Sequence, residues 1–163
     1  MKHFTFFRIA AYLTLLFCVA HTAGGMLAQE SLGSAADGVF AAMKSTHFDF
    51  NGSDSTWYGF WMGFGLTVSA FLVLVAVTAL VLDRVTPEAW PQVRVIAWAL
   101  IAAMTFNGVI AWRYFFAGPL AFSIVIVALL VIGTARKGRS AVASPVQSAR
   151  PPAVQPLPLG QQL

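Results

Sequence analysis

The residues best suited to chemistry in this sequence are a few polar side chains inside long apolar runs. His21 and Thr22 lie near the end of the first run, Trp61 near the start of the second, and Asn107 and Arg113 near the end of the third. A histidine can carry a proton or bind a metal ion, an amide forms hydrogen bonds, and a guanidinium binds phosphate. Because polar groups are costly in an apolar environment, each is a candidate functional residue.

His21 is a weak candidate for catalysis, as a general acid or base or a proton relay. The competing interpretation is a structural histidine that donates a hydrogen bond to a carbonyl of a neighbouring helix. A metal site needs three or four ligands, and Glu30, His47 and Asp49 do not have a ligand spacing such as His-x-x-x-His. The sequence therefore predicts no metal site, no cofactor and, on balance, no enzyme.

Three other features near these polar residues allow two interpretations each. Gly25 lies one helical turn from His21 on the same face, where it could let a ligand approach the backbone or could end a helix. Arg113 could pair with Asp49, Asp54 or a lipid phosphate, and is favoured as an interfacial anchor. The third feature, a set of aromatic side chains, could form an interfacial belt or line a pocket for an apolar molecule: Trp57, Tyr58, Trp61, Trp112 and Tyr114.

The composition of the chain indicates the class of protein to which it belongs. The chain has 163 residues, of which 58% are hydrophobic and only 10% charged, whereas soluble domains carry roughly 25% charged residues. Cys18 is the only cysteine, so an intrachain disulfide is excluded. These values exclude a soluble domain, a disordered chain and a disulfide scaffold, and indicate an integral membrane protein.

The apolar runs are long enough for membrane-spanning helices. A span needs about 20 apolar residues, and four runs meet this length: 9–26, 58–82, 93–112 and 115–135. The last two form one block interrupted by Arg113 and by Gly118-Pro119, which predicts a short turn between two helices. We therefore expect an all-α transmembrane four-helix bundle over residues 1–135.

The distribution of Lys and Arg predicts the orientation of these spans. With both termini in the cytoplasm, eight basic residues lie inside and only Lys44 and Arg113 lie outside. This N-in, C-in arrangement places His21, Thr22, Trp61, Asn107 and Arg113 in the outer leaflet. A cleaved signal peptide that ends near Cys18-Val19-Ala20 is a competing interpretation of the first run.

Two segments lie outside the predicted spans. In the outer loop 28–57, Val39, Phe40, Met43 and His47 recur at helical spacing, Asp37 could cap that helix, and an Asn51-Gly52 turn follows. Either Ser55 or Thr56 should cap the second span. The tail 136–163 contains a basic cluster and then many prolines, Pro145 among them, so we expect it to be disordered and cytoplasmic.

Three stretches carry a resemblance to a known family. They are His21-Thr22-Ala23-Gly24-Gly25, the loop run from Met43 to Gly52, and the run from Trp57 to Leu66. Over residues 9–112 the chain resembles a family of small bacterial four-helix integral membrane proteins with an HTxGG motif, and in architecture it is similar to DoxX-like proteins. The resemblance implies the fold and a bacterial inner membrane, and it assigns no catalytic residues.

These observations lead to one favoured function and one alternative. The favoured function is non-enzymatic, with the outer half binding a membrane lipid or a partner helix through His21, Thr22, Gly25, Trp61, Asn107 and Arg113. The alternative is an enzyme or redox accessory subunit that acts on a membrane-soluble substrate such as a quinone, with His21 as proton carrier. A homo-oligomer or a partner membrane protein fits the first hypothesis, and nucleic acid is not an expected partner.

Overall fold

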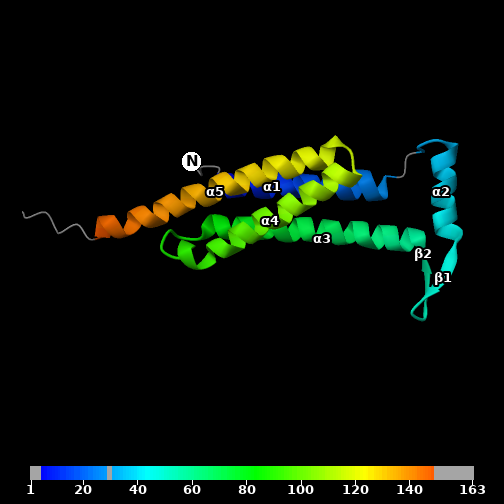
Figure 1. The fold of residues 1–163 in the computed structure, drawn as a ribbon, viewed down its shortest axis with the longest axis horizontal. Coiled ribbons are helices and arrows are strands. Elements are labelled where there is room, and N and C mark those ends of the chain that lie inside the picture. Colours follow the sequence, from blue (N-terminus) through cyan, green and yellow to red (C-terminus); the bar gives the residue numbers. More distant parts are fainter. Residues whose placement is uncertain (1–4, 29–30, 149–163) are drawn as a thin grey trace, which may run out of the picture.

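Four long helices dominate the computed structural model, which describes residues 5–28 and 31–148 of the chain (Figure 1). The elements in chain order are α1 (Phe6–Val19), the π-helical segment η1 (Ala20–Leu27), α2 (Ser34–Ser45), β1 (His47–Phe50), β2 (Ser53–Thr56), α3 (Trp57–Arg84), α4 (Trp90–Tyr114) and α5 (Ala117–Ser148). The continuous helix Phe6–Leu27, α3, α4 and α5 are each long and apolar enough to cross a membrane. The predicted all-α, four-helix membrane fold is confirmed.

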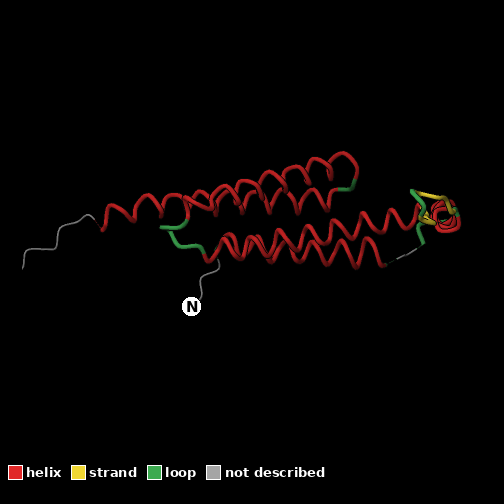
Figure 2. The backbone as a smooth tube through the Cα atoms, turned by 90° about the horizontal axis from the view of Figure 1, so that it is seen from below, coloured by secondary structure: helices red, strands yellow, loops and turns green. Residues whose placement is uncertain are grey.

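The helices form two layers. One layer holds α1 with η1 and α3, and the other holds α4 and α5 (Figure 2). Helix α1 packs on both α3 and α5, whereas α3 and α4 share few contacts. Helix α2 lies across one end of the bundle, which we call the cap end; the opposite end, where α5 continues past the other helices, is the tail end (Figure 1).

Small residues let the helices pack closely. Ala10, Ala11, Ala76 and Ala97 are completely buried, and such small side chains allow helix backbones to approach one another in membranes. Many large apolar side chains instead face outward, among them Leu74, which is 62% exposed. A surface of this kind is suited to lipid, which agrees with the four predicted spans.

The helix ends follow signals present in the sequence. Thr56 begins α3 as predicted, because its side-chain Oγ1 accepts a hydrogen bond from the Gly59 backbone N–H at 3.0 Å. Thr5 caps α1 in the same way through the Arg8 N–H. The predicted short turn between the third and fourth spans is also confirmed, since only Phe115 and Phe116 separate α4 from α5.

The tail end corrects the predicted disorder of residues 136–148, because α5 remains helical to Ser148. The Lys137 Nζ donates hydrogen bonds to the carbonyls of Leu82, Asp83 and Val85 at 2.6–2.9 Å, which fixes α5 against the end of α3. Pro145 lies in the last turn of α5, where its missing N–H removes a single backbone hydrogen bond. The rest of the predicted tail, 149–163, lies outside the described residues.

An ion pair joins the first helix to the same end of α3. The Arg8 guanidinium lies 2.6 Å from the Asp83 carboxylate, whose side chain is only 3% exposed, and the Thr5 hydroxyl donates a further hydrogen bond to that carboxylate. Arg136 of α5 stacks on the Phe6 ring of α1. The tail end is therefore held together by polar and cation–π contacts between α1, α3 and α5.

The structure of the predicted outer loop, 28–57, matches the prediction in part. Val39, Phe40 and Met43 lie in α2 as expected, but His47 is not part of this helix and begins strand β1. Asn51 and Gly52 form the predicted turn, with φ of 55° and 82°, and these values select the tight hairpin in which β1 pairs with β2. Helical spacing alone could not reveal that the chain reverses at Asn51.

Asp37 does not cap α2, which corrects a second detail of the prediction. The N-cap position is Gly33, which has no side chain to accept a hydrogen bond. The Asp37 carboxylate instead accepts hydrogen bonds from the Ser31 hydroxyl at 2.5 Å and from the Leu32 N–H at 3.2 Å. The aspartate thus fixes the segment that enters α2.

Candidate functional site

Polar side chains of the first helix form hydrogen bonds with α3 near the cap end. The His21 Nε2 donates to the Gly65 carbonyl at 3.0 Å, and the Thr22 and Ser69 hydroxyls share a hydrogen bond of 2.7 Å. The Cys18 thiol lies 3.5 Å from the Ser69 carbonyl. These contacts match the structural interpretation of His21, since its Nε2 pairs with a backbone carbonyl of a neighbouring helix.

The π-helical segment η1 packs against α3. Its backbone bonds span five residues, as in the 2.8 Å bond from the Ala28 N–H to the Ala23 carbonyl, and π-helical turns are frequent at functional sites. Met26 is 4% exposed, and its thioether occupies the space where a side chain at Gly65 would begin. The missing side chain of Gly65 therefore admits Met26.

Asn107 belongs to a separate contact, in the other layer. Its Nδ2 donates to the Ser123 hydroxyl at 3.0 Å, and that hydroxyl donates to the Pro119 carbonyl at 2.9 Å. Ser123 is only 1% exposed. Asn107 thus ties α4 to α5 and does not meet His21 or Thr22, although all three lie toward the cap end.

Arg113 lies in the last turn of α4, and its side chain faces outward. Its guanidinium lies 5.6 Å from the centre of the Tyr114 ring. The acids expected as partners have other contacts, since Asp54 pairs with His47 and Asp49 accepts a hydrogen bond from the Gly52 N–H. Among the described residues, no ion pair joins Arg113 to an acid, so its expected pairing with Asp49 or Asp54 is not found.

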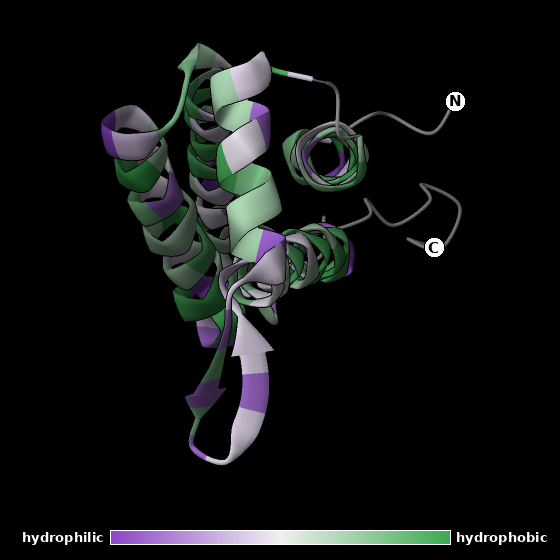
Figure 3. Ribbon diagram, turned by 90° about the vertical axis from the view of Figure 1, so that its right-hand side faces the viewer, coloured by the Kyte–Doolittle hydropathy of each residue, from purple (hydrophilic) through white to green (hydrophobic). Residues whose placement is uncertain are grey.

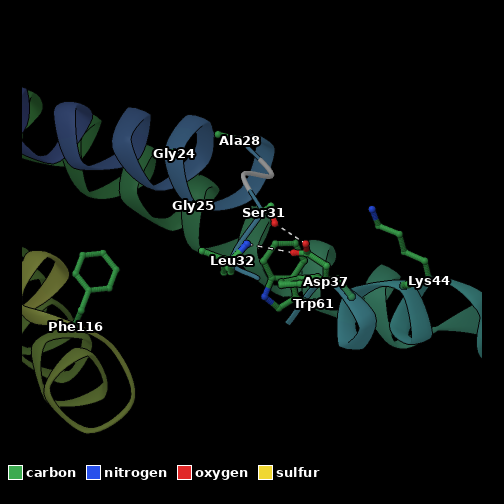
Figure 4. A pocket seen from close by; sticks show the side chains of 11 residues that line it. Gly24, Gly25, Ala28, Ser31, Leu32, Asp37, Lys44, Trp61 and Phe116 are labelled. Atoms are coloured by element: carbon green, nitrogen blue, oxygen red, sulfur yellow. Dashed lines mark hydrogen bonds between the residues drawn. The ribbon is translucent and has the colours of Figure 1, made fainter. Parts of the chain in front are cut away.

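A cleft opens at the cap end between η1, α2, the start of α3 and the α4–α5 turn. Its volume is about 790 Å³. We call it the cap cleft and define it by its lining residues: Gly24, Gly25, Ala28, Ser31, Leu32, Asp37, Phe40, Ala41, Lys44, Trp61 and Phe116. In Figure 4, Phe116 stands on the α4–α5 turn, across the cleft from Leu32 and Trp61.

The walls of the cap cleft differ in character. The Phe40 ring packs edge-on against Trp61 with 5.5 Å between ring centres, and Leu32 and Phe116 extend the apolar wall. Asp37 and Lys44 are the titratable side chains among the described lining residues, and both lie on α2. The Lys44 ammonium lies 4.7 Å from the centre of the Tyr58 ring. The cleft therefore joins an apolar wall to a polar rim.

The glycines of η1 leave room in the cleft. A Cβ built at Gly24 meets nothing within 4 Å, and one built at Gly25 meets only the His21 Nδ1, at 4.0 Å. The backbone of η1 therefore faces open space at both positions. Close approach of a ligand to the backbone, one of the two interpretations of Gly25, is compatible with this geometry.

The cleft brings together only part of the predicted site. Gly25 and Trp61 line it, whereas His21 and Thr22 bond to α3, Asn107 bonds to α5, and Arg113 lies outside the lining. Asp37 and Lys44 were not among the predicted site residues; their spacing of seven on an amphipathic helix was the available signal. In the described part of the chain, no group of three His, Cys, Asp or Glu residues could hold a metal ion.

Comparison of the chain with protein-family models, with curated proteins and with solved structures finds no match. The resemblance based on the His21-Thr22-Ala23-Gly24-Gly25 run therefore stays a prediction, and no residue role is transferred through it.

Proposed function

We propose that this multi-pass membrane protein binds a membrane lipid in the cap cleft and catalyses no reaction. The observation that supports the proposal best is the pairing of an apolar wall, built by Phe40, Trp61 and Phe116, with a rim that carries Lys44 and Asp37. A lipid has the same two parts, an acyl chain and a polar head. Ligand pockets combine apolar walls with few polar groups in this way.

The charges at the two ends support an orientation for this proposal. Among the described residues, six basic side chains lie toward the tail end: Arg8, Arg84, Arg94, Arg136, Lys137 and Arg139. Of the basic residues in ranges 5–28 and 31–148, only Lys44 and Arg113 lie toward the cap end. Because basic residues favour the cytoplasmic side, we place the tail end in the cytoplasm and the cap cleft at the outer face of a bacterial inner membrane. An alkaline phosphatase fused at Ser53 should be active, and an inactive fusion contradicts this orientation.

A redox role with a quinone has less support from the site. His21 is the proton carrier in that hypothesis, but it does not line the cap cleft and its Nε2 bonds to the Gly65 carbonyl. The lipid proposal needs no proton carrier, and it uses side chains that line the cleft.

A pair of glycine variants tests the proposal. Gly24→Leu adds an apolar side chain at a residue that lines the cleft, and nothing lies within 4 Å of the Cβ position at Gly24. Gly38→Leu is the matched control, since Gly38 also faces open space but does not line the cleft. Native mass spectrometry of the protein purified in mild detergent measures the lipid that each variant retains.

The expected result is at least a tenfold weaker retention in Gly24→Leu, which corresponds to about 1.4 kcal/mol of binding free energy. The control should retain lipid like the parent protein, and both variants should unfold near the parent temperature. Equal retention in all three proteins contradicts the proposal. A quinone as the retained molecule would instead support the redox hypothesis.

A further inference from the structure

The β-hairpin beside α3 has two chemically different faces. Residues opposite one another in the hairpin lie on the same face, so the pairs Phe48–Ser55 and Phe50–Ser53 share one face, which we call the aromatic face. The opposite face carries His47, Asp49 and Asp54. The His47 Nδ1 lies 2.9 Å from the Asp54 carboxylate there. The hairpin is therefore amphipathic.

The aromatic face continues without a break onto α3. Ring centres are 5.1 Å apart for Phe50 and Phe60, and 4.8 Å apart for Phe48 and Trp57. The next ring along α3 is that of Phe64, 6.1 Å from Phe60. Together these five rings form one aromatic strip that runs from the hairpin along the first two turns of α3.

This strip is largely uncovered. Phe50 is 52% exposed, Trp57 57% and Phe64 68%. Phe64 lies inside the apolar helix Trp57–Arg84, which is long enough to cross a membrane. Phe64 therefore lies on the exposed apolar surface of a candidate membrane span, and the strip extends that surface to the hairpin.

The hairpin also projects sideways from the bundle. In Figure 1 it extends from the end of α3 roughly perpendicular to the long helices, and the end-on view of Figure 3 shows it beyond the outline of the bundle. A segment with this direction at the end of a spanning helix runs along the membrane surface. Its polar face can then stay in water while its aromatic face meets lipid.

We infer that the β-hairpin lies on the membrane surface, with the rings of Phe48 and Phe50 inserted at the boundary between headgroups and acyl chains. Its occupant is the lipid bilayer itself, at a surface separate from the cap cleft. Aromatic side chains are favoured at this boundary, and the Asp49 and Asp54 carboxylates are kept out of the hydrocarbon by their place on the opposite face. The hairpin thus anchors the cap end and holds α2 at the level of the cleft.

Spin labels on the two faces test this inference. Cys18 is the only cysteine, so a Cys18→Ala background accepts one new label at a time. Ser53→Cys places the label on the aromatic face, and the neighbouring Asp54→Cys places it on the polar face, as a matched control. The full chain is reconstituted in phospholipid vesicles, and collision rates with oxygen and with a water-soluble nickel complex are measured by electron paramagnetic resonance.

The inference predicts a ratio of oxygen to nickel collisions that is several-fold higher for the Ser53→Cys label than for the Asp54→Cys label. Adding Phe50→Asp should abolish this difference, because a charged side chain at the tip opposes insertion. Equal ratios on the two faces would overturn the inference, as the hairpin would then stand in water. A Ser53→Cys label shielded from both reagents would overturn it too, since a protein partner or a second copy would then cover the face.

Discussion

At the residue scale, Gly65 determines how closely η1 approaches α3. The Met26 thioether occupies the space where a side chain at Gly65 would begin, and the Gly65 carbonyl accepts the hydrogen bond from His21. Gly63, two residues before Gly65 in the same helix, faces open space instead. The two glycines of the same helix therefore have different roles.

We predict that Gly65→Leu lowers the free energy of unfolding by about 1–3 kcal/mol, the usual cost of overpacking. The new side chain would displace the Met26 thioether and push η1 away from α3. Gly63→Leu should change stability little, because its side chain enters open space. Thermal unfolding in detergent measures both variants. Equal effects of the two substitutions would show that the packing of Met26 contributes nothing.

A second prediction at this scale concerns the hydrogen bond from Asn107 to Ser123. In a double-mutant cycle of Asn107→Ala and Ser123→Ala, the coupling energy should be about 0.6–1.7 kcal/mol, the range of interhelical hydrogen bonds in membranes. Lipid retention should not change, because neither residue lines the cap cleft. A coupling energy of zero, or a loss of lipid in Asn107→Ala, contradicts this assignment.

The sequence revealed which polar residues lie in the spans but not their partners. Ser69 and Ser123 pair with Thr22 and Asn107, yet serine is common in apolar helices and neither position has a distinctive spacing. The depth of a residue follows from its place in a span, whereas its partner depends on how the helices rotate. The predicted site residues therefore lie at a similar depth in the membrane but belong to two different helix layers.

At the element scale, α5 supports the end of α3 through Lys137. The last carbonyls of a helix lack intrahelical partners, and the Lys137 ammonium donates to the Leu82 and Asp83 carbonyls and, just past the helix, to that of Val85. A positive charge at this position also interacts favourably with the helix dipole. The residues that this contact joins are 52 to 55 positions apart in the chain.

We predict that Lys137→Met lowers the free energy of unfolding by about 2 kcal/mol, because three charge-assisted hydrogen bonds are lost. Arg139→Met is the matched control: it removes the same charge from the same helix, but Arg139 is exposed. Chemical denaturation in detergent micelles compares the two variants. If the control is destabilised as strongly, the general loss of charge, and not the capping of α3, explains the effect.

The four spans could be predicted because length and apolarity decide them. The first three predicted spans lie within observed helices, and the fourth, 115–135, begins two residues before α5. The hairpin was missed although its Asn51-Gly52 turn was recognised, since four-residue strands such as β1 give too short an alternation to stand out. The prediction placed the end of the fourth span too early, because Lys137 is held by hydrogen bonds to α3 and Arg136 by its contact with Phe6 of α1. Contacts of this kind have no signature in the local sequence.

At the scale of the whole molecule, α1 holds the bundle together, because it contacts both α3 and α5 while α3 and α4 share few contacts. Phe7, Ala10 and Ala11 of α1 are buried in the core. We predict that the first helix is retained in the mature protein, so intact mass spectrometry should give a mass that includes residues 6–27. A protein that begins just after Ala20 would support the cleaved signal peptide and contradict this prediction.

Photo-crosslinking can show whether the cap cleft holds a lipid. The delipidated protein in detergent receives one equivalent of a phospholipid with a diazirine at the end of an acyl chain, and crosslinked peptides are identified by mass spectrometry. We predict crosslinks at the apolar wall, in the peptides that contain Phe40, Trp61 and Phe116, and their loss in Gly24→Leu. Crosslinks confined to the outward-facing side chains of the spans, such as Leu74 and Val81, would contradict the account.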